Sequence, residues 1–587
     1  TKGKKTTRYS YDAAGNVTGV TYPDGSSVSY VLDAMGNILS MTDALGKETT
    51  YEYSKAGRLI ATTNALGHRT SMTYDANGNQ NSLTDAAGYT ASTTYTGQNQ
   101  VSSITDGLGN KTTMAYNQME QLTELTDALG GKTQYTYNEL GYPIQVTDAN
   151  GHVTKMTYTS TAQLEEVTLP DGTTVKQEYD ALDRLIKQTH SSGLVTEYSY
   201  DAANRVVNKK DNQDLNETYT YDKAGNRLTL TNSLGEVTQY SYNSDNQLTK
   251  VVYADKTSET FTYDVMGNVA SSTDQEGKTK TYHYDQNGNL LKTVDHLKRE
   301  TKYSYDEAGN LAKLTKPSGA TTTFDYTTLD QLKTIKTPTG RTVESSYDPV
   351  GQVTKRTING KRETTYTYDP NGNLLEETNP LGQVTKRTYD SLNRLTSESD
   401  AAGQWTKYGY DQDNHLTKIT DEAGGVASMT YDANGNLTSV TSGSKRVKTY
   451  TYDLKDQLLT ATQGSGEKAS TSSYTYDSVG NVTSVTNGNG KVTSYSYDQL
   501  SNLVERMTSL GDKETYTYNV NNQLEKVTKS DGKTISYDYN KLDQLLKVEY
   551  SEKQDGQVLY TYDADGRRVS MSDLTGTSQY ATNEEGE

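Results

Sequence analysis

Apolar and polar positions recur along the chain with a period of 21 residues. Steps of 21 from Tyr11 reach a tyrosine each time up to Tyr452, except at Leu32; after a step of 24 come Tyr476, Tyr497, Tyr518 and Tyr539, and a last step of 23 reaches Tyr562. Of the 27 anchor positions, 26 are tyrosine, and 24 of the 26 intervals are 21 residues. A fixed period of this kind is the signature of a repeat architecture. We therefore expect one continuous array of about 27 units over residues 1–587, with longer loops near 460–473 and 548–558.

The residues between the anchors form two short segments with the pattern of β-strands. In Thr49-Thr50-Tyr51-Glu52-Tyr53, the residues Thr49, Tyr51 and Tyr53 alternate with period 2, which predicts a strand with one packed face. Six residues past the anchor, 23 of 27 units carry Leu, Val or Ile. A second apolar site lies three residues later, with the opposite parity. Either a bulge or a strand that contacts both faces would allow that spacing.

Two turns with the outline Asp-x-x-Gly separate these segments. The residue after the anchor is Asp, Asn, Ser or Thr in all 27 units, and three positions further on 24 units carry Gly, Asn or Asp, which tolerate a positive φ. The acidic side chain caps the backbone and the glycine takes the left-handed position, as in a type I turn closed by a bulge. We expect the repeat to be held by the anchors Tyr11, Tyr53, Tyr74, Tyr221, Tyr263, Tyr305, Tyr368, Tyr431, Tyr476 and Tyr562. The corresponding turn pairs are Asp12 and Gly15, Asp75 and Gly78, Asp306 and Gly309, Asp369 and Gly372, and Asp432 and Gly435.

These elements predict an all-β fold, because a turn interrupts the chain too often for a helix. Tight turns favour an antiparallel β-meander with two strands per unit; the alternative is a parallel β-solenoid with one unit per rung. Open twisted sheets rarely exceed about ten strands without curling. A meander of this length is therefore expected to coil into a hollow shell.

Composition agrees with a thin wall and narrows the possible partners. The chain has 49 Tyr but only 2 Phe and 1 Trp, and its formal net charge is −18. Nucleic-acid binding is not expected, because the neutralisation of phosphates needs clustered Lys and Arg. No apolar run is long enough to insert into a membrane. The absence of Cys excludes disulfides and thiolate chemistry.

No signal peptide opens the sequence and the pattern starts and stops mid-unit, so any export signal is expected outside this segment.

The unit resembles the YD repeat of the Rhs/YD-repeat family. The hexapeptide Tyr-Asp-x-x-Gly-Asn carries the resemblance at Tyr74–Asn79, Tyr305–Asn310, Tyr368–Asn373 and Tyr431–Asn436. Members include bacterial polymorphic toxins, wall-associated proteins, insecticidal toxin-complex subunits and the teneurins. The resemblance implies an extracellular or cell-wall-associated shell that encloses or displays a C-terminal toxin or cargo domain of the same longer polypeptide, as in interbacterial competition.

Such shells usually end in a core segment with Asp-Pro-x-Gly, at which the toxin is released by autoproteolysis. Asp348-Pro349-Val350-Gly351 and Asp369-Pro370-Asn371-Gly372 match those letters, but both fall on the first turn of a repeat, where Pro suits the position after the turn-opening residue. We interpret both as turns. Release chemistry is therefore not assigned to this segment.

Other catalytic or ligand-binding patterns are not evident. The six histidines, at positions 68, 152, 190, 283, 296 and 415, form no metal-spaced pair. The column of turn Asp is explained by backbone capping and lacks the tandem motif of a calcium-binding roll. We expect no enzyme activity, cofactor or metal. Exposed tyrosines could stack on sugars, which leaves an extended adhesion or spacer module that binds a cell-surface glycan or protein as the alternative function.

Overall fold

The computed structural model describes residues 5–443, 446–552 and 556–580, and in them the chain forms one open antiparallel sheet of 55 strands. From β1 (Arg8–Tyr11) to β53 (Gln557–Tyr562), every odd-numbered strand ends on an anchor residue and is four to seven residues long. Every even-numbered strand from β2 (Val17–Thr21) to β54 (Arg568–Asp573) begins six residues past an anchor and is five or six residues long. The last strand is β55 (Gly576–Gln579).

Each strand pairs antiparallel with the strands before and after it in the chain, as in the hairpin of β29 (Glu300–Tyr305) and β30 (Leu311–Thr315). The antiparallel meander is confirmed, and the parallel solenoid is excluded for the described strands. The helix in the described residues is the single 3-10 turn Gly466–Lys468, between β44 (Leu458–Gln463) and β45 (Ser470–Tyr476). This turn lies in the first of the two long intervals. The second interval contains the connection from β52 (Leu545–Tyr550) to β53, of which residues 553–555 lie outside the described part.

A β-bulge at each anchor explains the two apolar sites of opposite parity. In the hairpin of β29 and β30, Tyr305 pairs with Leu311 and Tyr303 with Leu314, and the register shifts by one residue between Ser304 and Tyr305. Directly paired residues point to the same face of a sheet, so the bulge brings both leucines onto the face of the two tyrosines. Of the two explanations left open by the sequence, the bulge is the right one.

The two faces of the ribbon therefore differ in chemistry. The face with Tyr303, Tyr305 and Leu311 is half-buried, whereas Lys302 and Lys313 on the opposite face are exposed. Within the described residues, the buried apolar side chains are Ala61, Val251, Val527 and Val548, and no large side chain is fully buried. The wall is a single layer, held by hydrogen bonds and by contacts within each face.

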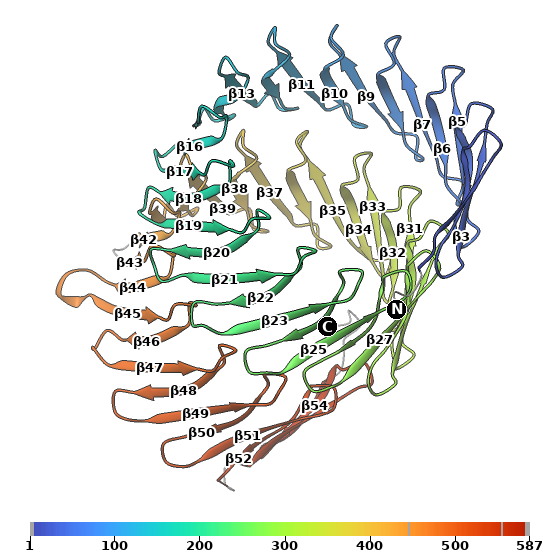
Figure 1. Cartoon of the computed structure of the whole chain (residues 1–587). Helices are drawn as coiled ribbons and strands as arrows, with labels where there is room; N and C mark the ends of the chain where they lie inside the picture. Colours follow the sequence, from blue (N-terminus) through green and yellow to red (C-terminus); the bar gives the residue numbers. More distant parts are fainter. Residues whose placement is uncertain (1–4, 444–445, 553–555, 581–587) are drawn as a thin grey trace.

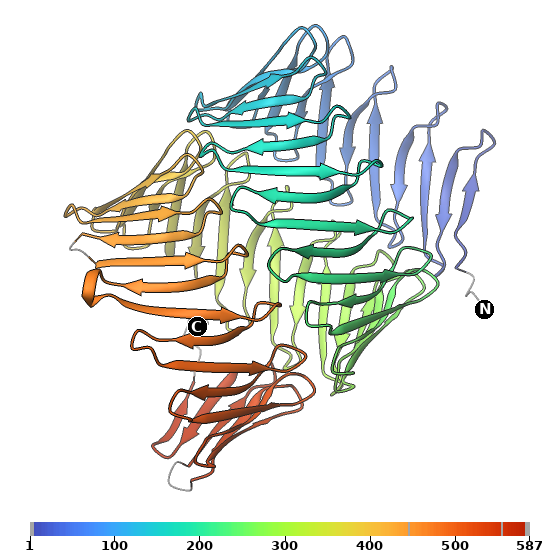
Figure 2. The same cartoon turned by 60° about the vertical axis from the view of Figure 1, so that its left-hand side comes forward.

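The ribbon winds into a spiral (Figures 1 and 2). Hydrogen bonds join residues that are 241 to 265 positions apart, or about twelve repeats. The chain of 587 residues is more than twice that long, so it makes more than two coils. In Figure 1, β3 (Ser27–Leu32) lies near the start of the first coil, and the ribbon returns beneath it at β27 (Thr279–Tyr284). The predicted coiling is confirmed, and the sheet stays open rather than closing as a barrel.

Candidate functional site

The first turn of each repeat is built by the residue after the anchor. Asp306 illustrates the arrangement: its Oδ1 accepts hydrogen bonds from the backbone N–H of Ala308 (2.9 Å) and Asn310 (2.8 Å). The N–H of Gly309 donates to the carbonyl oxygen of Asp306 (3.2 Å), and Gly309 has φ +92°. A residue with a Cβ is strained at that φ, so glycine is favoured here for a backbone reason. These contacts close the turn without any contribution from a core.

The other turn residues singled out from the sequence have the same geometry. The glycines lie at φ +87° (Gly15), +94° (Gly78), +89° (Gly372) and +84° (Gly435). The side chains of Asp12, Asp75, Asp369 and Asp432 each accept the N–H of the asparagine four residues on, at 2.9 Å. The two Asp-Pro-x-Gly sequences lie in such turns, with the N–H of Gly351 donating to the carbonyl oxygen of Asp348 at 3.1 Å. These residues are spread along one edge of the ribbon and do not gather at one point.

The residue after the turn glycine connects one repeat to the next, a role that sequence reasoning missed. Asn310 donates from Nδ2 to Asp306 of its own turn (3.2 Å) and to Oδ1 of Asp330 in the following turn (2.9 Å). Where arginine takes this place, its guanidinium lies over the ring of the next anchor, as Arg184 does over Tyr200 at 4.8 Å. The available signal was the preference for Asn, Gln or Arg at this position.

The anchor tyrosines form a hydrogen-bonded ladder along the ribbon. From Tyr74 onward, each anchor hydroxyl donates to the carbonyl oxygen of the first residue of the even-numbered strand before it. The acceptor of Tyr74 is Leu59 at 2.6 Å, and that of Tyr305 is Leu290 at 2.9 Å. The acceptor normally lies 15 residues back in the chain, but it lies 18 back for Tyr476 and 17 back for Tyr562. The two longer intervals therefore leave the ladder unbroken, because Tyr476 and Tyr562 still donate to the first residue of the even-numbered strand before them.

The remaining anchors fit the same ladder, apart from the first ones. Tyr221, Tyr263, Tyr368 and Tyr431 donate to the carbonyl oxygens of the following acceptors at 2.7 to 2.8 Å: Val206, Leu248, Val353 and Leu416. Tyr11 lies on the edge strand β1 and is 59% exposed. Burial raises the pKa of Tyr53, which is half-buried in β5 (Glu48–Tyr53).

Ladder and turns shift the pKa of their titratable groups in opposite directions. Burial raises the pKa of the anchors Tyr305, Tyr368 and Tyr476. On the same face, burial and the carboxylate of Glu217 raise the pKa of Tyr219 to about 12. In the turns, the hydrogen bond from the asparagine side chain lowers the pKa of Asp222. The structure thus favours neutral tyrosines and ionised turn carboxylates.

Successive coils meet along a line that we call the seam, where second turns of one coil lie against first turns of the next. The seam repeats one polar contact: an asparagine of a first turn donates Nδ2 to the aspartate that opens a second turn. Asn287 donates to Asp43 (2.7 Å), Asn371 to Asp127 (3.0 Å) and Asn521 to Asp274 (3.5 Å). The same contact recurs in different parts of the spiral. It is therefore a general feature of how the repeats of successive coils meet.

Charged groups add to the seam. Lys278 forms ion pairs with Glu276 of its own turn and with Asp543 of the next coil (2.6 Å). The Nζ of Lys47 donates to the carbonyl oxygen of Asp306 (2.7 Å). Asp171 and Asp413 bring two carboxylates together, and burial followed by the charge of Asp171 raises the pKa of Asp413. In the described residues, inter-coil contacts involve first turns from Asp245 onward and second turns up to Ser318.

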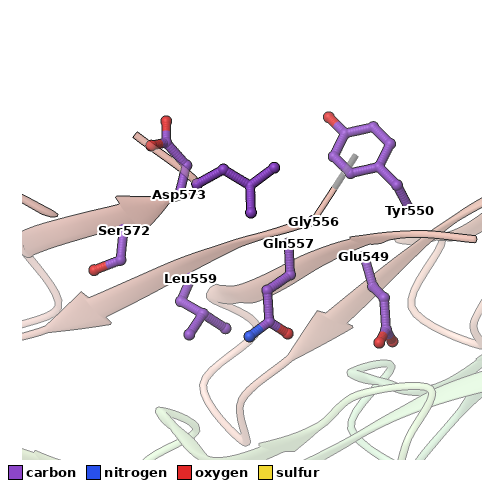
Figure 3. Close-up of a pocket in the computed structure, with 8 residues that line it drawn as sticks. Glu549, Tyr550, Gly556, Gln557, Leu559, Ser572 and Asp573 are labelled. Atoms are coloured by element: carbon purple, nitrogen blue, oxygen red, sulfur yellow. The ribbon is translucent and has the colours of Figure 1, made fainter. Parts of the chain in front are cut away.

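The charged side chains of one pocket lie on opposite faces of the wall. In an open depression between β52, β53 and β54, Glu549 and Gln557 point to one side of the sheet, while Tyr550 and Asp573 point to the other (Figure 3). The two carboxylates therefore do not face each other. Within the described part of the chain, no group of three His, Asp or Glu side chains is placed to hold a metal ion, and no helix has the length and apolarity needed to cross a membrane.

The histidines belong to turns and strands rather than to a shared site. His152 and His415 close turns through Nδ1, with Asp148 (3.0 Å) and Asp411 (3.2 Å) as partners. His415 also stacks on the ring of Tyr431, with 4.7 Å between the ring centroids. Their contacts are those expected of the residue that closes each turn.

Comparison with known families identifies the repeat. The RHS Repeat profile matches residues 3–27, 33–68, 53–90, 95–132, 121–153, 263–300, 284–321, 305–342, 431–468 and 476–515, which together cover just over half of the chain. The chain belongs to the RHS-repeat family. The Teneurin YD-shell profile also matches this RHS-repeat chain, over residues 171–273 and 340–449. No curated protein sequence matches it significantly.

One solved structure shares the fold of this RHS-repeat chain, and a second is reported beside it as a weaker match. The crystal structure of TcdB2-TccC3-Cdc42 matches with a TM-score of 0.50 and 14% identity, over 98% of this chain and 35% of the other. The Tc holotoxin pore of Photorhabdus luminescens, carrying the TccC3 mutation D651A, matches with a TM-score of 0.46 and 13% identity, over 99% of this chain and 43% of the other. The chain thus spans about a third of the length of the first structure.

Proposed function

We propose that this chain is a wall segment of a secreted or surface-associated YD-repeat shell that encloses a C-terminal cargo or toxin domain of a longer polypeptide. The observation that carries the proposal is the seam: a ribbon joined to itself about twelve repeats later surrounds a space instead of extending as a rod. A single-layer wall with little buried apolar surface among its described residues suits containment, and we propose that the segment acts as a wall rather than as an enzyme. Membership of the RHS-repeat family and the shared fold with the TcdB2-TccC3-Cdc42 structure support this function.

A protection experiment tests enclosure. A small protease-sensitive reporter domain is fused after Glu587, and its digestion is followed in the intact fusion protein. We expect the reporter to survive a protease that digests it rapidly when it is free. Reporter loss at the rate of the free domain would contradict enclosure and would favour display on the outside.

A seam variant shows whether coiling causes the protection. In the double variant Asn287→Asp and Asn371→Asp, new carboxylates face Asp43 and Asp127, so like charges replace two hydrogen bonds across the seam. The matched control is Asn77→Asp, at the same turn position in the first coil, where the residue bonds to Asn99 of the neighbouring repeat. We expect faster digestion in the double variant and not in the control. Equal protection in both variants would exclude the seam as the barrier.

The alternative function, an extended adhesion or spacer module, predicts a different particle. Solution scattering should show a compact hollow object for a shell and an elongated rod for a spacer. Binding of glycans by this segment alone, measured on a glycan array, would favour adhesion. The coiled arrangement supports the shell.

A further inference from the structure

One contact in the seam differs in charge from the others. The third residue of a first turn faces the preceding coil, and in the described part of the seam aspartate occupies this position at three places: Asp245, Asp413 and Asp565. Asp245 forms an ion pair with Lys5 (2.8 Å), and Asp565 accepts the N–H of Ser318 (3.3 Å). Asp413 instead lies against Asp171, so two carboxylates meet across the seam.

A backbone hydrogen bond holds the two carboxylates together. The N–H of Asp171 donates to Oδ1 of Asp413 (3.4 Å), while Oδ1 of Asp171 accepts the N–H of Thr173 in its own turn (2.7 Å). The second turn that contains Asp171 reads Leu-Pro-Asp-Gly-Thr over residues 169–173, so it provides no cation of its own. The contact thus supplies one hydrogen bond and brings two like charges together.

The charged groups around Asp413 and Asp171 are matched to one another. They belong to the turn of Asp413, to the first turn before it and to the adjacent second turn. As pairs of cation and carboxylate, they are His415 with Asp411 (3.2 Å), Arg394 with Asp390 (2.8 Å) and His152 with Asp148 (3.0 Å). Among the described residues, neither Asp413 nor Asp171 forms an ion pair, so the repulsion between them is not compensated.

The half-buried carboxyl of Asp413 binds its proton more tightly because of this contact. Burial is the largest cause, the charge of Asp171 is the next, and together they raise the pKa of Asp413. When a contact raises the pKa of a group, the contact is more stable below that pKa and loses stability as the pH rises through it. The aspartates that cap the turns respond in the opposite sense, because their pKa is lowered, as at Asp222.

We propose that Asp171 and Asp413 form a proton-sensitive contact between two coils, which tightens when one of the two carboxylates is neutralised. A protonated Asp413 has an O–H to donate to Asp171, just as the side-chain amides of Asn371 and Asn521 donate to aspartates elsewhere in the seam. The proton comes from water, and no other co-reactant is needed. Both turns lie inside the seam, so the proposal depends on the winding of this chain and not on a cargo.

Hydrogen exchange at neutral pH tests the effect of charge. The variants Asp413→Asn and Asp171→Asn each remove one charge and keep an oxygen that accepts the same N–H. Exchange of the backbone amides in the two facing turns should slow by about two- to fivefold in either variant, the range of a partly exposed charge interaction. The matched control is Asp565→Asn, which faces a turn without a carboxylate; exchange there should stay the same or become faster. High salt should slow exchange at the contact in the wild-type chain and not in the two variants, because salt screens the repulsion.

A pH series completes the test. In the wild-type chain, exchange in the two turns, corrected for the intrinsic effect of pH, should slow as the pH falls from about 7 towards the ordinary Asp pKa of about 3.9. This dependence should disappear in Asp413→Asn and persist in His415→Asn, which removes the nearby imidazole and places there the side chain that closes other turns, as Asn310 does. Exchange that is equally fast in the wild-type chain and in both charge variants would overturn the proposal, and so would a pH dependence that vanishes with His415. Circular dichroism of all variants establishes that the sheet is intact.

Discussion

Two kinds of contact hold this molecule together: those between neighbouring repeats and those between successive coils. Neighbouring repeats share many more hydrogen bonds than successive coils do. Each repeat is joined to the next by backbone hydrogen bonds between strands, by a tyrosine hydroxyl and by the side chain that follows the turn, as at Tyr305 and Asn310. Each coil is joined to the next by scattered polar contacts at turn tips, such as Asn371 with Asp127. Stability therefore resides along the ribbon, whereas the seam joins one coil to the next.

Acid should weaken the ribbon most, because the effect acts on many turns at once. Hydrogen bonds from asparagine side chains lower the pKa of Asp12, Asp33, Asp75 and Asp222 in the folded state. A lowered folded-state pKa stabilises the fold above the ordinary Asp pKa of about 3.9, and that stability is lost as the pH falls through the folded values. We expect the melting temperature to drop steeply below about pH 4. The double variant Asp75→Asn and Asp222→Asn keeps an acceptor but does not titrate, so its melting temperature should depend less on pH; an unchanged dependence would contradict the assignment.

Gly309→Val should produce the largest effect of a single substitution. A β-branched residue at φ +92° costs about 1–3 kcal/mol in the free energy of unfolding. The matched control is Gly97→Val, at a turn glycine outside the left-handed region with no atom near its added Cβ. Thermal or urea unfolding followed by circular dichroism compares the two variants. Equal stabilities would show that the left-handed turn does not hold the ribbon.

Tyr305→Phe tests the ladder by itself. The substitution removes the hydroxyl that donates to the carbonyl oxygen of Leu290 and keeps the ring, so we expect a loss of about 1 kcal/mol. Tyr303→Phe is the matched control, on the same strand and the same face. Urea unfolding should separate the two variants; a greater loss for Tyr303→Phe would contradict the role of the anchor.

Lys278→Ala should loosen the seam and leave the ribbon intact. Partly exposed ion pairs contribute about 1 kcal/mol or less, so the melting temperature should change little. Hydrogen exchange should instead quicken in the turn that contains Asp543, which belongs to the next coil. Lys302→Ala, which removes an ion pair with Glu300 inside one repeat, should leave exchange at that turn unchanged.

Limited proteolysis should have the smallest effect on the fold. The first cuts should leave intact both the contacts between neighbouring repeats and the contacts between coils. We expect them between Gly464 and Ser472, between Ser551 and Gly556, or at the termini, since exposed loop tips are preferred cleavage sites. Residues 553–555 lie outside the described part of the structure. Mass spectrometry of early fragments checks the positions, and early cuts inside a regular repeat would contradict this expectation.

The sequence predicts what is local to one repeat and misses what depends on curvature. The motif Tyr-Asp-x-x-Gly predicts the period, the turn glycines and the strand ends at the anchors. Each of these features depends only on residues that are close in the sequence. The contact between Asn371 and Asp127 could not be predicted, since small twists between strands add up over about twelve repeats before the two residues meet. The reach of Asn310 to Asp330 was also missed, because it requires knowing which turns lie side by side.

The order in which strands pair along the chain also has a consequence for how the wall folds. Every strand pairs with its immediate predecessor, so a new hairpin needs only the one before it to become part of the sheet. Chains dominated by such local contacts fold quickly, and they fold from the end that emerges first during synthesis. We therefore expect the spiral to be wound progressively from its N-terminal end. Each new coil would close against the previous one only when its partner turn, about twelve repeats later, has been added.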